Sequence, residues 1–146
     1  MKSIIRYLQV LHLIVGIGAA FGGLIGMLNP DGSVIGMSTD VLRNGPFNNF
    51  MLPSVFLFTV LGIGNIIAAY TTKLNKPYQA YISGILGSIL CMWIIIQCYI
   101  MWAIAMLHVI FFVIGIIQLG FSVFLAFKIK LYPTQYIMKI LSKMSD

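Results

Sequence analysis

The sequence predicts an all-α fold, an integral membrane four-helix bundle. Two observations support this prediction. The first is composition: of 146 residues, 60% are hydrophobic and 8% are charged, whereas soluble domains are about 25% charged. The second is the stretch from Pro77 to Phe127, 51 residues without Asp, Glu, Lys or Arg. Because one membrane crossing needs about 20 apolar residues, this stretch holds two crossings.

Four hydrophobic stretches are each long enough to cross a bilayer. They run from about Ile4 to Leu28, Phe50 to Thr72, Gln79 to Trp102 and Ala103 to Phe127. A single membrane domain over residues 1–146 accounts for a chain of this length. A cleavable signal peptide is the alternative for the first stretch, since Lys2 and Arg6 precede its apolar run. We prefer a membrane span, because the run is long and contains Gln9 and His12.

The basic residues indicate the orientation. Of the nine, Arg43 falls in the loop from Asn29 to Asn49 with Asp31 and Asp40. The others flank the opposite ends of the stretches: Lys2, Arg6, Lys73, Lys76, Lys128, Lys130, Lys139 and Lys143. By the positive-inside rule both termini are cytoplasmic (N-in/C-in), and the loop, roughly 20 residues long, lies outside.

The outer loop is bounded by the turn signals Asn29-Pro30-Asp31-Gly32 and Asn44-Gly45-Pro46. Between them, Ser38 or Thr39 is expected to cap a short helical turn that runs through Leu42. The loop is too apolar for a solvated tether. It either folds over the mouth of the bundle as a lid or rests on lipid headgroups.

The tail, residues 131–146, predicts a short basic amphipathic helix. Its apolar residues recur at i, i+3, i+4 and i+7, with two lysines off that face: Ile137, Ile140, Leu141 and Met144, then Lys139 and Lys143. Such a helix lies on the cytoplasmic leaflet; a frayed, solvated tail is the alternative. Membrane lipids with anionic headgroups are therefore the expected partners at that face, and nucleic acid is not.

Polar residues within three of the stretches share one depth. His12, Asn65 and Gln118 each lie seven to nine residues from the cytoplasmic end of their stretch, about 10–14 Å deep. Arg6 and Gln9 precede His12 at three-residue steps, on the same helix face. These residues form either a pocket for a headgroup or small ligand, or hydrogen bonds between helices. The sequence favours the second interpretation.

A second polar level is predicted near the outer face. Gln97 and His108 flank the hairpin turn between the last two stretches, each about five residues from it, with Trp102 nearby. A pocket covered by the outer loop explains this pair, and so does a hydrogen bond between the two side chains.

Catalytic and metal-binding motifs are not found in the sequence. No nucleotide loop, nucleophile motif or metal-ligand spacing is present. His12 and His108 lie toward opposite faces, about 15 Å apart or more, so one haem iron is not expected to join them. Cys91 and Cys98, seven residues apart on one predicted helix, are too distant for a disulfide. No catalytic residue, metal or cofactor is therefore expected.

Gly18, Gly22 and Gly26 follow the four-residue spacing that lets membrane helices approach closely. Their partner is either another helix of this chain or a second subunit, in a homo-oligomer or with a partner membrane protein.

Several short motifs resemble one family. They are Trp93-Ile94 with Gln97, Leu107-His108 ahead of Phe111-Phe112 and Gly115, and Gly45-Pro46-Phe47 leading to Leu52-Pro53. This pattern resembles small bacterial four-span membrane proteins that are loosely DoxX-like. The resemblance implies a four-helix fold in the bacterial plasma membrane, supplies no reaction, and adds Gln97 and His108 as candidate site residues. Members often carry an acidic residue at Gln97 and a proline at Val109, so a charge-dependent role is not implied here.

The expected function is that of a multi-pass, non-enzymatic membrane protein that binds a lipid or small hydrophobic ligand within the bundle. An accessory or scaffolding subunit of a membrane complex is the alternative, and a quinone- or lipid-linked membrane enzyme comes third. The candidate ligand-binding residues are Arg6, Gln9, His12, Asn65, Gln118, Gln97 and His108.

Overall fold

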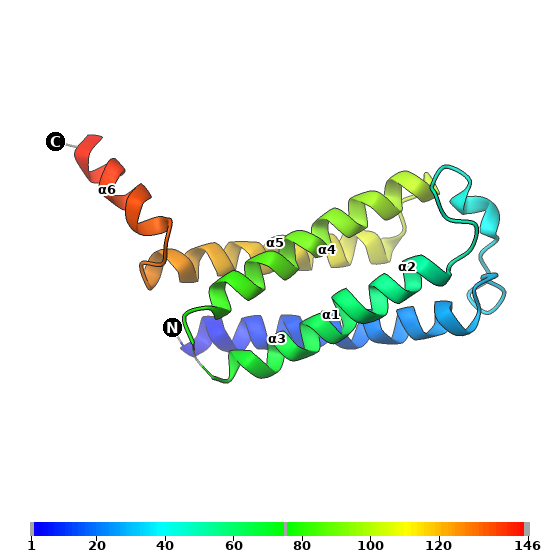
Figure 1. The fold of residues 1–146 in the computed structure, drawn as a ribbon, viewed down its shortest axis with the longest axis horizontal. Helices are drawn as coiled ribbons and strands as arrows, with labels where there is room; N and C mark the ends of the chain where they lie inside the picture. The colour runs from blue at the N-terminus through cyan, green and yellow to red at the C-terminus, as the bar shows by residue number, and fades with distance from the viewer. Residues whose placement is uncertain (1, 75, 145–146) are drawn as a thin grey trace.

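The computed structural model describes residues 2–74 and 76–144, and those residues form helices and loops without a strand. Four of its helices are long and apolar enough to cross a membrane, at Ser3–Leu28, Met51–Thr72, Gln79–Met101 and Met106–Lys128. They form an elongated bundle with both chain ends toward one end and the long loop at the other (Figure 1). The prediction of an all-α chain with four helices of spanning length is confirmed.

The bundle consists of four helical rods of membrane-spanning length, and each rod runs antiparallel to the one before it in the chain. The first is α1, and the second is one continuous rod made of α2, a π-helical segment η2, and α3. The hairpin of α4 and α5 follows, and α6 ends the chain. Their bounds are α1 Lys2–Leu28, α2 Met51–Phe56, η2 Leu57–Ile63, α3 Gly64–Thr72, α4 Gln79–Met101, α5 Met106–Lys128 and α6 Thr134–Met144.

The turn between α4 and α5 is longer than the sequence predicted. Helix α4 ends at Met101 and α5 begins at Met106, whereas the predicted spans meet between Trp102 and Ala103. Trp102 caps α4 in the left-handed conformation, with φ of 48°, which glycine usually adopts at this position. The boundary was missed because the turn residues are as apolar as the helices.

Small residues bring the helices of each hairpin into backbone contact. A Cβ atom on Gly23 of α1 would lie 2.6 Å from the backbone nitrogen of Phe58. On the facing helix, a Cβ on Gly62 would lie 2.9 Å from Cα of Ala20. Helices α4 and α5 approach in the same way, since a Cβ on Gly87 would lie 3.1 Å from the backbone oxygen of Gly115. Close packing of this kind stabilises helix pairs in lipid.

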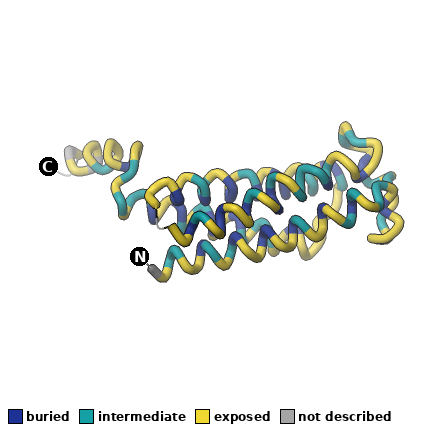
Figure 2. The backbone as a smooth tube through the Cα atoms, turned by 60° about the horizontal axis from the view of Figure 1, so that its bottom comes forward, coloured by how far each residue is buried: buried dark blue, intermediate teal, exposed yellow. Residues whose placement is uncertain are grey.

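Buried residues face the interior of the bundle, and exposed residues cover its outside (Figure 2). The central core contains Val15, Ala19, Leu61, Leu90, Trp93 and Ile94. A second cluster of Leu8, Ala80 and Leu125 lies nearer the chain ends. Large apolar side chains such as Ile17 and Ile85 are about 60% exposed on the outside, as expected for helices that face lipid rather than water.

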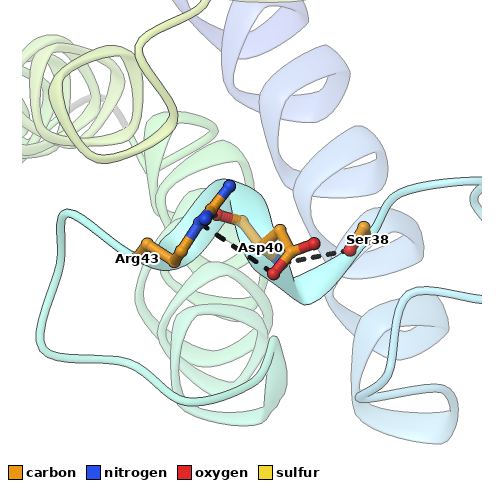
Figure 3. Close-up of polar contacts among 3 residues, drawn as sticks. All are labelled: Ser38, Asp40 and Arg43. Atoms are coloured by element: carbon orange, nitrogen blue, oxygen red, sulfur yellow. Dashed lines mark hydrogen bonds and ion pairs between the residues drawn. The ribbon is translucent and has the colours of Figure 1, made fainter.

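The outer loop contains a short 3₁₀ turn, η1 Thr39–Leu42. Ser38 caps this turn, because its hydroxyl accepts a hydrogen bond of 3.2 Å from the backbone N–H of Asp40. Arg43 donates from Nε to the backbone oxygen of Asp40 at 3.1 Å (Figure 3). Leu42 packs with Phe50 and with Ile100 of α4 in a small buried cluster. The loop therefore contacts the outer end of α4.

Helix α6 projects from the end of the bundle that carries the chain ends (Figure 1). The hydroxyl of Thr134 donates to the backbone oxygen of Ala126 at 3.1 Å and ties the start of α6 to α5. Ile140 and Met144 of the predicted apolar face are exposed. The side chains of Leu141 and Lys143, together with residues 145–146 of the predicted tail, lie outside the described part of the chain.

Candidate functional site

The inner polar level is a buried cluster to which four rods each contribute a side chain. His12 of α1, Asn65 of α3, Ser83 of α4 and Gln118 of α5 are all 0% exposed. Nδ1 of His12 lies 2.7 Å from Oδ1 of Asn65, and its Nε2 lies 2.8 Å from Oγ of Ser83. One imidazole therefore links three of the rods.

The hydrogen bonds determine where the proton of His12 sits. Nδ2 of Asn65 donates to the backbone oxygen of Leu61 at 2.8 Å, so the amide oxygen of Asn65 is the atom that faces the imidazole. An amide oxygen only accepts, and Nδ1 of His12 must therefore carry the proton. Nε2 is then the acceptor, and the hydroxyl of Ser83 donates to it. In the neutral ring, this one tautomer satisfies both nitrogens.

The amides around this cluster complete it. Nε2 of Gln79 donates to Oγ of Ser83 at 3.3 Å and also to the hydroxyl oxygen of Thr72. Nε2 of Gln118 lies 3.4 Å from Oδ1 of Asn65 and 3.2 Å from Nδ1 of His12. Because Nδ1 already carries a proton, we assign the Gln118 bond to Asn65. Oε1 of Gln118 is buried without a partner among the described residues.

The structure thus brings together three of the five residues predicted at the inner level. Arg6 is exposed and Gln9 is half-buried, and neither hydrogen-bonds to the cluster within the described ranges. Ser83 was missed because a small polar residue beside glycines in a membrane helix is usually a packing residue, and Gln79 was missed because it lies at the predicted end of its span. The arrangement of His12, Asn65 and Gln118 is that of hydrogen bonding between helices, with Oε1 of Gln118 as the one buried polar atom of the three side chains that has no partner among the described residues.

The outer polar level lines a cavity of about 190 Å³ between α1, α4 and α5. Its walls are largely apolar, with Val15 and Ala19 from α1, Leu90 and Ile94 from α4, and Phe111 from α5. The polar side chains on its walls are Trp93, Gln97 and His108. Both residues predicted at this level therefore face one cavity, and they make no hydrogen bond to each other within the described residues.

His108 has a structural role that fixes its tautomer. The N-cap residue of α5 is Ala105, which has no side-chain oxygen, and its backbone N–H donates to Nδ1 of His108 at 3.1 Å. Nδ1 is therefore an acceptor, and in the neutral ring the proton is on Nε2. The side chain is 9% exposed, and its Nε2–H has no partner in residues 2–74 and 76–144. His108 therefore lines the cavity with an N–H donor that no described residue accepts.

Two further polar side chains line the cavity without a hydrogen bond among the described residues. Trp93 is 7% exposed and stacks on Phe56, with ring centroids 4.4 Å apart. Its indole Nε1 is buried without a hydrogen-bond partner in the described part of the chain. Gln97 is half-buried and likewise makes no hydrogen bond there. A buried donor without a partner is uncommon, because it costs about 1–3 kcal/mol.

Trp93 was not predicted as a site residue, although a signal existed. It precedes Gln97 by four residues, so the two side chains lie on one face of α4. Only the positions of α1 and α5 show that this face meets a cavity. A second, smaller cavity of about 30 Å³ lies on the other side of Trp93 and Gln97, beneath Leu42 and Phe47 of the outer loop.

The glycines predicted to mediate association have contacts within the chain. A Cβ on Gly26 would lie 2.0 Å from Oγ of Ser54, and a Cβ on Gly18 would lie 3.0 Å from the ring of Phe111. Gly22 lines the cavity with Gly18. The glycine face of α1 therefore borders the second rod and the cavity.

No group of three His, Cys, Asp or Glu residues that could hold a metal ion is present among the described residues. Cys91 and Cys98 are both free thiols. Searches against family models, curated proteins and solved structures find no match to this chain. Its function must therefore be inferred from the geometry of the two polar levels.

Proposed function

We propose that this protein binds a small hydrophobic molecule in the outer cavity of its membrane-spanning bundle. The observation that carries the proposal is the combination of an apolar cavity with unpaired polar groups on its wall. Binding sites for small molecules are typically apolar, with a few polar groups that fix orientation. The volume of about 190 Å³ is below the range of about 300–1,000 Å³ typical of drug-sized ligands, so it suits a small molecule or part of a lipid.

The route into the cavity supports a ligand that comes from the bilayer. Gly18, Gly22 and Leu107 line the cavity and are also exposed on the outside of the bundle. The opening between α1 and α5 therefore faces the region that lipid occupies. A molecule dissolved in the membrane reaches the cavity through this opening without passing through water.

The proposed setting is a bacterial plasma membrane, with DoxX-like membership as part of the proposal. Both termini are cytoplasmic, the outer loop faces the medium, and α6 rests on anionic headgroups. Support comes from the positions of the basic residues, and from the placement of both chain ends at one end of the bundle (Figure 1). Cysteine labelling of intact cells tests this orientation. We expect Arg43→Cys to react with an impermeant maleimide and Lys76→Cys to react only after lysis.

Filling the cavity tests the binding proposal. A Cβ on Gly22 would meet only Cδ2 of Leu57, at 3.6 Å, so Gly22→Leu places its side chain in the cavity without a backbone clash. Gly120→Leu is the matched control, because a Cβ there meets nothing within 4 Å. Native mass spectrometry of the membrane-extracted protein should show a retained small molecule in the parent and in Gly120→Leu, and its loss in Gly22→Leu.

The same measurement distinguishes the other candidate functions. Retention of the same molecule by Gly22→Leu would contradict binding in the outer cavity. A stoichiometric membrane subunit retained in place of a small molecule would support the scaffolding alternative, in which the exposed Gly18 and Gly22 contact a partner while Gly26 packs on Ser54. Conversion of a retained lipid or quinone during turnover would support the membrane-enzyme alternative.

A further inference from the structure

We infer that the ligand of the outer cavity is a neutral molecule with a hydrogen-bond acceptor, such as a carbonyl oxygen, directed at His108. This inference rests on the proposed function, because it assigns the chemical class of the molecule that the cavity takes. Its basis is the set of polar atoms on the cavity wall that the protein itself leaves unpaired.

The first of these atoms is Nε2 of His108. The ring cannot use Nε2 as an acceptor, since Nδ1 accepts from the backbone N–H of Ala105 at 3.1 Å and the proton of the neutral ring is then on Nε2. Nε2 is also absent from the buried unpaired atoms of the described residues, so a ligand atom can approach it. His108 therefore presents one donor in a fixed position.

Gln97, on α4, adds an amide that both donates and accepts, so it places no restriction on the ligand. Nε1 of Trp93 is unpaired among the described residues but buried, so a molecule in the cavity does not reach it unless the side chains that cover it shift. The donor of His108 is therefore the polar group that sets the chemistry of the ligand, and an acceptor oxygen on the ligand is what complements it.

The charge of the cavity indicates a neutral acceptor rather than an anion. Its lining residues among those described include no Lys or Arg, and burying a carboxylate without a cation is strongly unfavourable. The apolar remainder of the wall, with Val15, Leu90 and Phe111, suits a hydrocarbon body. A compact ketone or ester carries both features.

The test compares 2-decalone with decalin, two bicyclic molecules of nearly the same shape that differ by one carbonyl group. The chain has two tryptophans, so Trp102→Phe leaves Trp93 as the only indole and makes its fluorescence a reporter of the cavity. Titrations use the purified protein in dodecyl maltoside. We expect 2-decalone to bind about tenfold more tightly than decalin, the difference that one added hydrogen bond makes.

A second variant removes the His108 donor without unfolding α5. His108→Leu alone also removes the helix cap, so it is combined with Ala105→Ser, which supplies a serine at the N-cap. Ala105→Ser alone is the control. We expect 2-decalone affinity to fall to that of decalin in the double variant and to stay at the parent value in the control. The infrared carbonyl band of bound 2-decalone should shift to lower frequency in the parent, and less so in the double variant.

The outcomes separate the two proposals. Equal binding of both molecules to the parent protein would overturn the acceptor inference and leave the hydrophobic binding function standing. Tighter binding of 2-decalone that persists unchanged in the double variant would overturn the assignment of His108 as the donor. Failure of both molecules to change Trp93 emission, with Gly22→Leu behaving like the parent, would contradict the binding function itself.

Discussion

The hydrogen bond between Ser83 and His12 offers a direct measure of what the inner polar cluster contributes to stability. Ser83→Ala removes a hydroxyl that donates to Nε2 of His12 at 2.8 Å and changes side-chain volume very little. Hydrogen bonds between membrane helices contribute about 0.6 kcal/mol on average and up to about 1.7 kcal/mol. His12 is 0% exposed, so its unpaired acceptor finds no water, and we expect Ser83→Ala to cost about 1–1.5 kcal/mol.

A double-mutant cycle isolates this bond from other effects of the substitution. In a His12→Leu background the acceptor is gone, so Ser83→Ala should then cost almost nothing. Ser122→Ala is the matched control, because Ser122 is also a buried serine and donates to the backbone oxygen of Ala80 instead of to His12. Its cost should be the same with or without His12. The coupling energy should therefore be about 1 kcal/mol for Ser83 and near zero for Ser122.

The assay is reversible unfolding in mixed micelles, followed by circular dichroism as the fraction of denaturing detergent rises. Equal coupling of Ser83 and Ser122 to His12 would refute the assignment of Nε2 as the acceptor of the Ser83 hydroxyl. A larger cost of Ser83→Ala in the His12→Leu background than in the parent would refute it as well.

Two further predictions follow from the structure. Gly23→Ala should lower the free energy of unfolding by about 1–3 kcal/mol, because its Cβ would lie 2.6 Å from the backbone nitrogen of Phe58. The control, Gly120→Ala, should be neutral or slightly stabilising. Equal effects of the two substitutions on unfolding in micelles would contradict the close packing at Gly23. In the outer loop, hydrogen bonds from the backbone N–H and then the hydroxyl of Ser33 lower the pKa of Asp31. This contribution to stability is present above the ordinary carboxyl pKa and is lost as the pH falls through the lowered one. Ser33→Ala should raise that pKa part of the way back in an NMR titration, and an unchanged value would exclude the hydroxyl as a cause.

The helices were predictable because lipid imposes strict requirements on length and polarity. About 20 apolar residues are needed for each crossing, and the four stretches met that requirement clearly enough to give helix ends within a few residues. The turn at Trp102 was not predictable in the same way. Its residues are as apolar as those of the helices. The left-handed conformation, with φ of 48°, falls on Trp102 and not on a glycine, which is the residue that would have indicated a turn in the sequence.

The polar levels were predictable in depth but not in their internal pairing. Counting along each helix placed His12, Asn65 and Gln118 together, and the structure puts His12 in contact with both of the others. Counting does not give the rotation of one helix about its axis relative to its neighbours. That rotation decides that Ser83 reaches His12 and that Trp93 meets a cavity. It follows from close approaches such as Gly23 against Phe58, which depend on all the packed side chains at once.

The two polar levels differ because, in lipid, the free-energy cost of an unfilled gap depends on whether polar or apolar groups line it. At the inner level, unpaired groups such as the imidazole of His12 would be costly in hydrocarbon, so the side chains close on one another. At the outer level, no comparable force closes the cavity that Gln97 and His108 line. Lipid tails are as apolar as the cavity walls, and the hydrophobic effect that collapses such a gap in water is missing. The hydrogen-bonded level therefore links the four rods, while a cavity of about 190 Å³ remains at the level of Gln97 and His108.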